Sequence, residues 1–465
     1  MSSNVPDVDA PAPPPTVVRS TADLVRAAVS GWLGTALEFM DFQLYSLAAA
    51  LVFNEIFFSG SSPALAVVLA MATYGVGYLA RPLGALYFSR KGDKIGRKKV
   101  LFQTILLMGL ATTLIGFLPT YETIGILAPI LLVVLRLAQG FGAGAEISGA
   151  GVMLSEYAPA HRRGIIASLV ALGTNCGTLL ASGIWAILLV VLTQEQVIAW
   201  GWRIPFIASA LIMLFAVWVR FNLKESPVFE ERVDVVDGRA MTHDEYVEQA
   251  VQTNDIRTLQ SLERRPIKAI LVTFFLRFGQ AGNSGMIQTY LISFITVTLA
   301  MQKGVGANVV IVSSLIGFAT IPLVGWLGDK IGRRRMYIIM TSISLVLIVP
   351  TMLAINSTDI AWVFVGYVVI HNVSVLGLAS LENISIPEIF GARNRYTATA
   401  MVRETAAIIA TGIGPVVVAA WVAATSGSVV PIMVLLGVYT LCALIAAIIA
   451  REWTGRDLTD PRSAM

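Results

Sequence analysis

Apolar stretches of roughly 20 residues recur along the whole chain and are separated by short polar turns. A helix needs about 20 apolar residues to cross a hydrocarbon core of about 30 Å. The pattern therefore predicts twelve transmembrane helices. Their approximate ranges are 25–56, 64–88, 99–118, 125–154, 164–192, 200–220, 267–299, 307–327, 336–355, 360–384, 397–424 and 429–450.

Polar segments divide these helices into two sets of six. Residues 222–266 contain six Lys/Arg and ten Asp/Glu and form a polar central loop. The loop separates an N-terminal six-helix bundle, residues 25–221, from a C-terminal bundle, residues 267–450. We expect residues 1–24 to be a disordered tail and residues 451–465 a short tail. The expected fold class is an all-α integral membrane protein.

The composition agrees with this prediction. Hydrophobic residues make up 56% of the chain and charged residues 13%, against about 25% charged residues in a typical soluble protein. A net charge of +4 is too small for a nucleic-acid binder. Cys176 and Cys442 lie in apolar runs and indicate neither a disulfide framework nor a metal site.

The distribution of Lys and Arg predicts the orientation in the membrane. Basic residues gather in the turns near 89–99 and 328–336, and the turns on the other side are almost free of them, with Lys303 as the exception. Basic loops remain on the cytoplasmic side of a membrane. We therefore expect both termini and the central loop to lie in the cytoplasm, with the protein in the cell (inner or plasma) membrane.

An internal repeat relates the two halves. The hexapeptide Gly-Asp-Lys-Ile-Gly-Arg occurs at residues 92–97 and again at 328–333. A second repeat lies at the ends of the fourth and tenth predicted helices, where Glu156 and Arg163 match Glu388 and Arg395. Equivalent turns in two six-helix halves indicate parallel repeats about an axis along the membrane normal.

These motifs also carry a family resemblance. Residues 93–98 resemble the signature loop of the major facilitator superfamily. Five further stretches resemble the metabolite:H⁺ symporter family: Glu38–Phe42, Arg81–Gly84, Arg136–Glu146, Trp200–Phe206 and Glu225–Phe229. The resemblance implies proton-driven uptake of a small solute such as shikimate, α-ketoglutarate, citrate, proline or betaine. The chain departs from the family at Ser89 and Ala145, where glycine is common.

Charged residues inside the first and fourth predicted helices are the candidates for proton coupling. Glu38 and Asp41 are three residues apart and share one helix face. A charge at the bilayer centre costs about 2.5–3.5 kcal/mol on insertion scales, so such residues are retained for a function. Arg136 matches the family's Arg-x-x-Gln-Gly stretch and is a candidate partner. The alternative is a structural pair without proton turnover, but we assign Asp41 as the first candidate proton carrier.

The candidate substrate-binding residues are polar side chains within apolar helices. Guanidinium groups offer a planar fork to a carboxylate, which makes Arg136 and Arg277 the candidate anion ligands, although Arg277 also lies within reach of the cytoplasmic surface. The others would supply hydrogen bonds or line the cavity, or else make helix–helix contacts. They are Tyr45, Gln280, Asn283, Gln288 and His371.

The repeated turn is a candidate gate. Asp93, Arg97, Asp329 and Arg333 occupy matching positions at the predicted cytoplasmic surface. Surface ion pairs contribute only about 0–1 kcal/mol each, which suits a latch that must open. The alternative is that the positive charges set the topology alone. Glu146, nearer the cytoplasm than Arg136, is assigned to the gate as well.

Together these features predict a secondary active transporter that imports a small carboxylate by proton symport. The alternatives are a proton-driven exporter of metabolites or drugs and, less favoured, a non-transporting sensor. The sequence has no phosphate-binding loop of the Gly-x-x-x-x-Gly-Lys-Ser/Thr type. We therefore expect the proton gradient, and not ATP, to drive transport. The sequence also has no His-Glu-x-x-His, haem or zinc spacing, and we expect no enzymatic activity, no cofactor and no metal. The expected partners are the lipid bilayer, protons and a small-molecule substrate, and we expect a monomer.

Overall fold

The computed structural model describes residues 21–95, 97–144, 163–222, 234–236, 239–241, 267–390 and 395–455. Most of the predicted tails and most of the predicted central loop lie outside these ranges.

The first half consists of long helices joined by short ones. Its long helices are α1 (Thr21–Leu51), α3 (Pro63–Ile95), α4 (Arg97–Ile115), α6 (Leu127–Ala143), α8 (Arg163–Val191) and α10 (Arg203–Asn222). Between them lie α2 (Phe53–Ile56), α5 (Tyr121–Ile124), α9 (Gln194–Gln196) and the π-helical segment η2 (Val197–Gly201).

In the second half, several spans are interrupted by π-helical segments. The seventh span is α13 (Ile267–Gly285), η4 (Met286–Tyr290), α14 (Leu291–Ser293) and η5 (Phe294–Thr298). The eighth and ninth are α15 (Lys303–Ile331) and α16 (Arg333–Asn356). The tenth is α17 (Ile360–His371), η6 (Asn372–Gly377) and α18 (Leu378–Phe390). The last two are α19 (Arg395–Ala407), η7 (Ile408–Ile413) and α20 (Gly414–Ala424), then α21 (Val430–Ile449).

The predicted fold class of twelve membrane helices in two six-helix halves is confirmed. Within the described residues, seven helices are long and apolar enough to cross a membrane, and the pair Gln194–Gly201 and Arg203–Phe215, bent by 51°, adds an eighth. The other spans carry charged side chains, are shortened by a break, or continue into residues outside the described ranges. The central loop adds a short antiparallel hairpin, β1 (Asp234–Val236) with β2 (Arg239–Met241), in which Val236 faces Arg239.

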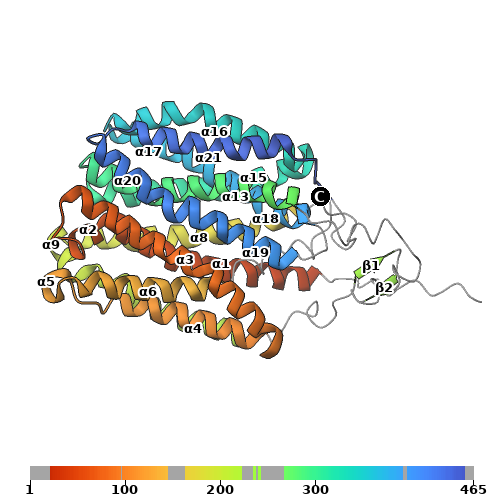
Figure 1. The fold of residues 1–465 in the computed structure, drawn as a ribbon, viewed down its shortest axis with the longest axis horizontal. Coiled ribbons are helices and arrows are strands. Elements are labelled where there is room, and N and C mark those ends of the chain that lie inside the picture. Colours follow the sequence, from red (N-terminus) through yellow and green to blue (C-terminus); the bar gives the residue numbers. More distant parts are fainter. Residues whose placement is uncertain are drawn as a thin grey trace, which may run out of the picture.

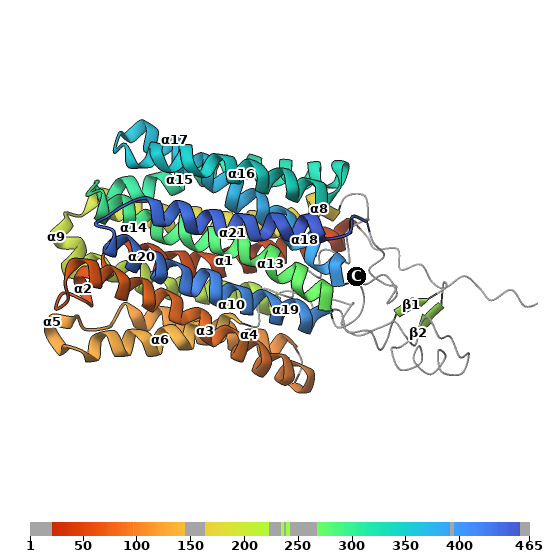
Figure 2. The ribbon, with the colours of Figure 1, turned by 45° about the horizontal axis from the view of Figure 1, so that its top comes forward.

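The two halves lie side by side with their helices nearly parallel. In Figure 1, α1, α3, α4 and α6 occupy the lower part and α15, α16, α17 and α21 the upper part, and Figure 2 shows the same division. The halves meet along two seams, where α8 packs against α15 and where α3 packs against α19, η7 and α20. We call the end that holds residues 95, 97, 163 and 331–333 the basic face, and the end that holds α2, α5 and α9 the opposite face.

Glycines allow α3 and α6 to approach closely. A Cβ atom at Gly140 would lie 1.9 Å from the carbonyl oxygen of Gly77, and one at Gly84 would lie 1.9 Å from that of Phe141. Any larger residue would push the helices apart, since real atoms do not approach so closely. This contact fixes the depth of α6 relative to α3 and thereby the position of Arg136.

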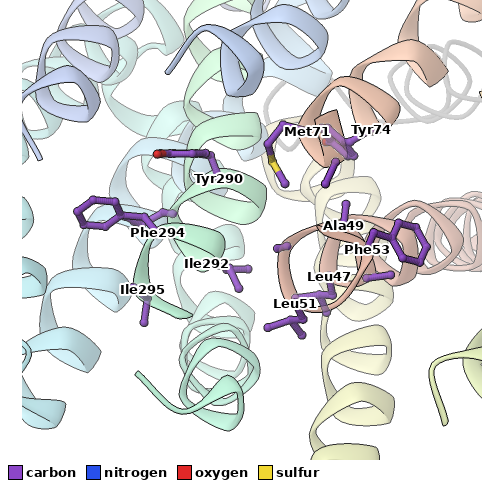
Figure 3. Close-up of a cluster of buried hydrophobic side chains, with 14 of the residues drawn as sticks. Leu47, Ala49, Leu51, Phe53, Met71, Tyr74, Tyr290, Ile292, Phe294 and Ile295 are labelled. Atoms are coloured by element: carbon purple, nitrogen blue, oxygen red, sulfur yellow. The ribbon is translucent and has the colours of Figure 1, made fainter. Parts of the chain in front are cut away.

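A hydrophobic cluster fills the bundle toward the opposite face. Its members include residues of the end of α1, of α2 and of the seventh span, and it is almost completely buried. Figure 3 shows Leu51 of α1 and Ile292 of α14 pointing toward one another, and both would contact a Cβ atom at Gly306 of α15. Because residues of both halves form the cluster, it closes the bundle at this depth.

Candidate transport site

Arg136 is the centre of the candidate site. It lies on α6 and is completely buried. Its Cζ atom is 4.0 Å from the centre of the Tyr45 ring, 4.7 Å from that of Phe42 and 5.5 Å from that of Tyr74. Aromatic faces attract a guanidinium at such distances. Among the described residues, no carboxylate forms an ion pair with Arg136.

Asp41 is connected to Arg136 through two polar side chains. The Thr112 hydroxyl lies 3.3 Å from Oδ2 of Asp41 and accepts a hydrogen bond of 2.8 Å from Gln139. The Oε1 atom of Gln139 accepts a hydrogen bond of 2.5 Å from Arg136. Sequence reasoning expected a direct partnership between carboxylate and arginine. The structure places Thr112 and Gln139 between them, and neither was a candidate.

Glu38, the second candidate for proton coupling, lies one helical turn closer to the basic face. It is buried, and its Oε1 atom is 3.3 Å from Nη2 of Arg81 on α3. The Nε atom of Arg81 is in turn 2.9 Å from Oε2 of Glu404 on α19. Arg81 therefore bridges carboxylates of the two halves.

The second half contains an ion cluster of its own. Arg277 holds both oxygens of Glu382, at 3.2 and 3.0 Å, and the Oε1 atom of Gln280 at 2.6 Å. Arg403 lies 3.3 Å from Glu382 as well. The two predicted substrate ligands Arg277 and Gln280 are thus engaged by Glu382 and by each other in this conformation.

Sequence reasoning did not assign a role to Arg81, Glu382, Arg403 or Glu404. A signal was present, because these ionisable residues lie inside predicted membrane helices, where ionisable side chains are rare and functional by default. Arg81 was noted only as part of a family motif.

The remaining polar candidates of the second half hydrogen-bond to neighbouring helices. Gln288 and His371 join through their Nε2 atoms at 3.0 Å, and Nδ1 of His371 lies 2.7 Å from the Ser313 hydroxyl. Asn283 donates to Thr440 at 3.0 Å. Both ring nitrogens of His371 are therefore satisfied, which corresponds to the structural alternative for this residue.

At the basic face, the repeated turn of the second half contacts the first half. Asp329 accepts hydrogen bonds from the backbone N–H groups of Gly164 at 2.8 Å and Ile165 at 3.1 Å, at the start of α8. A carboxylate is favoured at a helix N-terminus, where N–H groups have no partners within the helix. The predicted gate residues of this half thus bridge the two halves.

Arg333 extends this bridge. It pairs with Asp329 at 3.0 Å and with the buried Glu388, and Glu388 lies 3.7 Å from Arg163 of the first half. The repeated motif noted in the sequence therefore joins Arg163 and Glu388 in space. The side chains of Asp93 and Arg97 and all of Glu146, the other predicted gate residues, lie outside the described part of the chain.

The segment after α21 closes the N-terminus of α16. The preceding residue, Gly332, has φ 100° and no side chain to act as a cap. Instead, the Thr454 hydroxyl accepts from the backbone N–H of Arg333 at 2.7 Å. Partial burial raises the pKa of Glu452, but hydrogen bonds from Thr454 and from the backbone of Thr454, Arg334 and Trp453 outweigh it, so the pKa lies below its ordinary value.

An ion pair joins the halves near the opposite face. The ammonium group of Lys303, at the start of α15, lies 2.7 Å from Oε1 of Glu55 on α2. Sequence reasoning noted Lys303 only as an exception to the charge pattern. Deeper in the bundle, the hydroxyl groups of Ser46 and Thr289 are 2.6 Å apart.

The described residues contain no group of three or more His, Cys, Asp or Glu side chains that would hold a metal ion.

Comparison with known proteins identifies relatives along almost the whole chain. Residues 32–460 match the family model described as sugar (and other) transporter. The protein YdfJ of Escherichia coli (strain K12) is 51% identical over 422 residues, which cover 90% of this chain and 95% of YdfJ. The shikimate transporter of the same organism is 34% identical over 403 residues, covering 87% and 89% of the two chains. The proline/betaine transporter of Salmonella typhimurium (strain LT2) is 32% identical over 440 residues, covering 94% and 85%.

Solved structures of a transporter share the fold. A crystal structure of the D-xylose–proton symporter matches with a TM-score of 0.72 and 18% identity, over 93% of this chain and 99% of that one. The xylose transporter XylE in a partially occluded inward-open conformation matches with a TM-score of 0.69 and 15% identity, over 93% and 99%.

Proposed function

Because the chain belongs to the sugar (and other) transporter family of the major facilitator superfamily, it is a multi-pass membrane transporter and not an enzyme, and we propose that it imports a small organic carboxylate together with protons. The carboxylate binds Arg136, the proton binds Asp41, and the two halves alternate between the sides of the membrane.

The observation that carries this proposal is the uncompensated charge of Arg136. The other completely or nearly completely buried arginines that the structure describes, Arg81, Arg333 and Arg403, each pair with a carboxylate. A buried charge without an ionic partner is costly. A carboxylate that enters the site supplies that partner and can form a bidentate pair with the guanidinium.

Proton coupling follows from the connection between Asp41 and Arg136. A proton on Asp41 removes a negative charge from the hydrogen-bonded chain through Thr112 and Gln139. The positive charge of Arg136 is then less balanced, and an anion binds more tightly. Binding of the proton and of the anion therefore favour each other, which is the requirement for symport.

We propose that the basic face is cytoplasmic, since it holds Arg163, Lys330 and Arg333. In the described conformation, the Arg163–Glu388 ion pair and the hydrogen bond from the Gly164 backbone to Asp329 cross between the halves at this face. The 34% identity to a shikimate transporter makes shikimate the first substrate to test.

The experiment is uptake of radiolabelled shikimate, α-ketoglutarate, citrate, proline and betaine into cells that express the protein, at two external pH values, with and without a protonophore. We expect one of the carboxylates to accumulate faster at acid pH and the protonophore to abolish the accumulation. Cells carrying the empty vector give the background.

Variants of Arg136 then test the binding role. Arg136→Gln removes the charge, and we expect it to abolish uptake. Arg136→Lys keeps the charge but loses the planar fork, and we expect it to retain weak uptake with a raised KM. Uptake of proline or betaine alone, or full carboxylate uptake by Arg136→Gln, would contradict the proposal.

A further inference from the structure

Arg81 is held at the same time by a carboxylate of its own half and by one of the other half. Its Nη2 atom lies 3.3 Å from Glu38 of α1, and its Nε atom lies 2.9 Å from Glu404 of α19. All three side chains are buried. The Phe42 and Tyr78 rings lie 4.9 and 5.3 Å from its Cζ atom and hold the guanidinium between α1 and α3.

Arg403, which adjoins Glu404 on α19, contacts its own half of the protein. Arg403 lies 3.3 Å from Glu382 of α18, and Arg277 of α13 lies 3.0 Å from the same carboxylate. Two adjacent residues of one helix therefore make opposite connections: Glu404 reaches across the seam, and Arg403 stays within its own half.

Within each half, the described positive and negative side chains in the middle of the spans are equal in number. Among the described mid-span residues, the first half contributes Glu38, Asp41, Arg81 and Arg136, and the second half contributes Arg277, Arg403, Glu382 and Glu404. Each set contains two positive and two negative side chains. Among these described residues, separation of the halves breaks the Arg81–Glu404 pair and leaves neither set with a net charge.

The Arg81–Glu404 pair lies where it can control access from the basic face to the Arg136 site. On α3, Arg81 is one turn nearer that face than Gly77, which lies against Arg136. On α1, Glu38 precedes Asp41 by one turn. The Arg81–Glu404 pair therefore lies between the Arg136 site and the basic face.

We propose that Arg81 is the switch residue of the seam between α3 and α19. With the basic face closed, Arg81 holds Glu404 across the seam. When the halves separate, Arg81 stays with Glu38 and Glu404 turns to Arg403, so that Arg81 and Glu404 both keep an ionic partner. This inference requires alternating access only and holds whichever solute is carried.

The test measures the distance between the halves in the absence of substrate. Spin labels are attached at Tyr87→Cys on α3 and Ile339→Cys on α16, which are exposed and lie near the basic face, after Cys176 and Cys442 are replaced by serine. Pulsed electron paramagnetic resonance reports the distribution of distances. We expect Glu404→Gln to at least double the fraction of long distances, because it removes the cross-seam charge.

Two further variants separate the switch from a general loss of structure. Glu404→Asp keeps the charge, and we expect a distribution near that of the parent. Arg403→Gln leaves the cross-seam pair intact and removes the side chain that receives Glu404 when the halves separate, and we expect no rise in long distances. The proposal is overturned if Glu404→Gln leaves the distribution unchanged, or if Arg403→Gln widens it equally. Neither result depends on the identity of the substrate, so a failed uptake assay and a failed switch are distinguishable.

Discussion

The guanidinium of Arg136 stacks on the ring of Tyr45, with its Cζ atom 4.0 Å from the ring centre. Tyr45 is itself fixed by Phe53, whose ring centre is 5.2 Å away in an edge-to-face arrangement. Phe53 belongs to the hydrophobic cluster that closes the bundle toward the opposite face. The Arg136 guanidinium, which we propose binds substrate, thus stacks on Tyr45. Tyr45 also belongs to the hydrophobic cluster that closes the bundle.

Substitution of Tyr45 tests this contact. We expect Tyr45→Leu to raise KM for the transported carboxylate about tenfold, because a desolvated cation–π contact contributes up to about 2 kcal/mol. Tyr45→Phe keeps the ring face, and we expect a KM within about twofold of the parent. The measurement is the initial uptake rate against substrate concentration. Equal KM values for the leucine and phenylalanine variants would contradict the role of the ring.

The space beside Arg136 depends on Gly77. A Cβ atom there would lie 2.6 Å from Nε of Arg136, so Gly77→Ala must displace the arginine. Overpacking of this kind costs about 1–3 kcal/mol, and we expect uptake to fall at least tenfold while the protein still inserts. Gly183→Ala on α8 is the matched control, since its Cβ atom would meet nothing within 4 Å. Similar uptake by both variants would show that the position of Arg136 does not matter.

Asp41 is expected to couple transport to the proton gradient. Asp41→Asn cannot release a proton, and we expect it to abolish accumulation against a gradient while exchange of labelled for unlabelled solute continues. Thr112→Val removes the hydroxyl between Asp41 and Gln139, and we expect it to shift the pH at which uptake is half-maximal. Both are measured in proteoliposomes with an imposed pH gradient. Full accumulation by Asp41→Asn would exclude this carboxylate as the proton carrier.

Much of the fold was predictable because apolar length and turn chemistry are local properties. The predicted spans 307–327 and 429–450 correspond to α15, Lys303–Ile331, and α21, Val430–Ile449. The π-helical segments were not predictable. η6 and η7 lie inside the predicted spans 360–384 and 397–424, where the apolar pattern specifies a span but not the type of helix.

The sequence predicted some members of the candidate site but not the contacts between them. The charges of Glu38, Asp41 and Arg136 inside apolar helices were sufficient to identify them. Their partners lie on other helices, and helix rotation decides which side chains meet. Arg81 and Glu404 are more than 300 residues apart in the chain, and only the seam between α3 and α19 brings them together. No spacing in a single sequence specifies that contact.

The cap supplied by Glu452 gives folding stability a dependence on pH. Hydrogen bonds hold the folded pKa of Glu452 below the ordinary value of about 4.3, so the unfolded chain binds the proton more tightly. The stabilising contribution of the Glu452 carboxylate is therefore complete above the ordinary pKa. It is lost as the pH falls through the lowered pKa of the folded state. We expect Glu452→Gln to lower the unfolding temperature slightly at pH 7, and the difference from the parent to disappear as the pH falls through the lowered pKa of Glu452. Thermal unfolding of both proteins in detergent measures this, with Glu122→Gln at the opposite face as the control, because Glu122 lies on the short helix α5 and has no part in this cap. A difference that persisted unchanged in acid would mean that the glutamine variant acts through packing, and the carboxylate would then have no part in holding the start of α16.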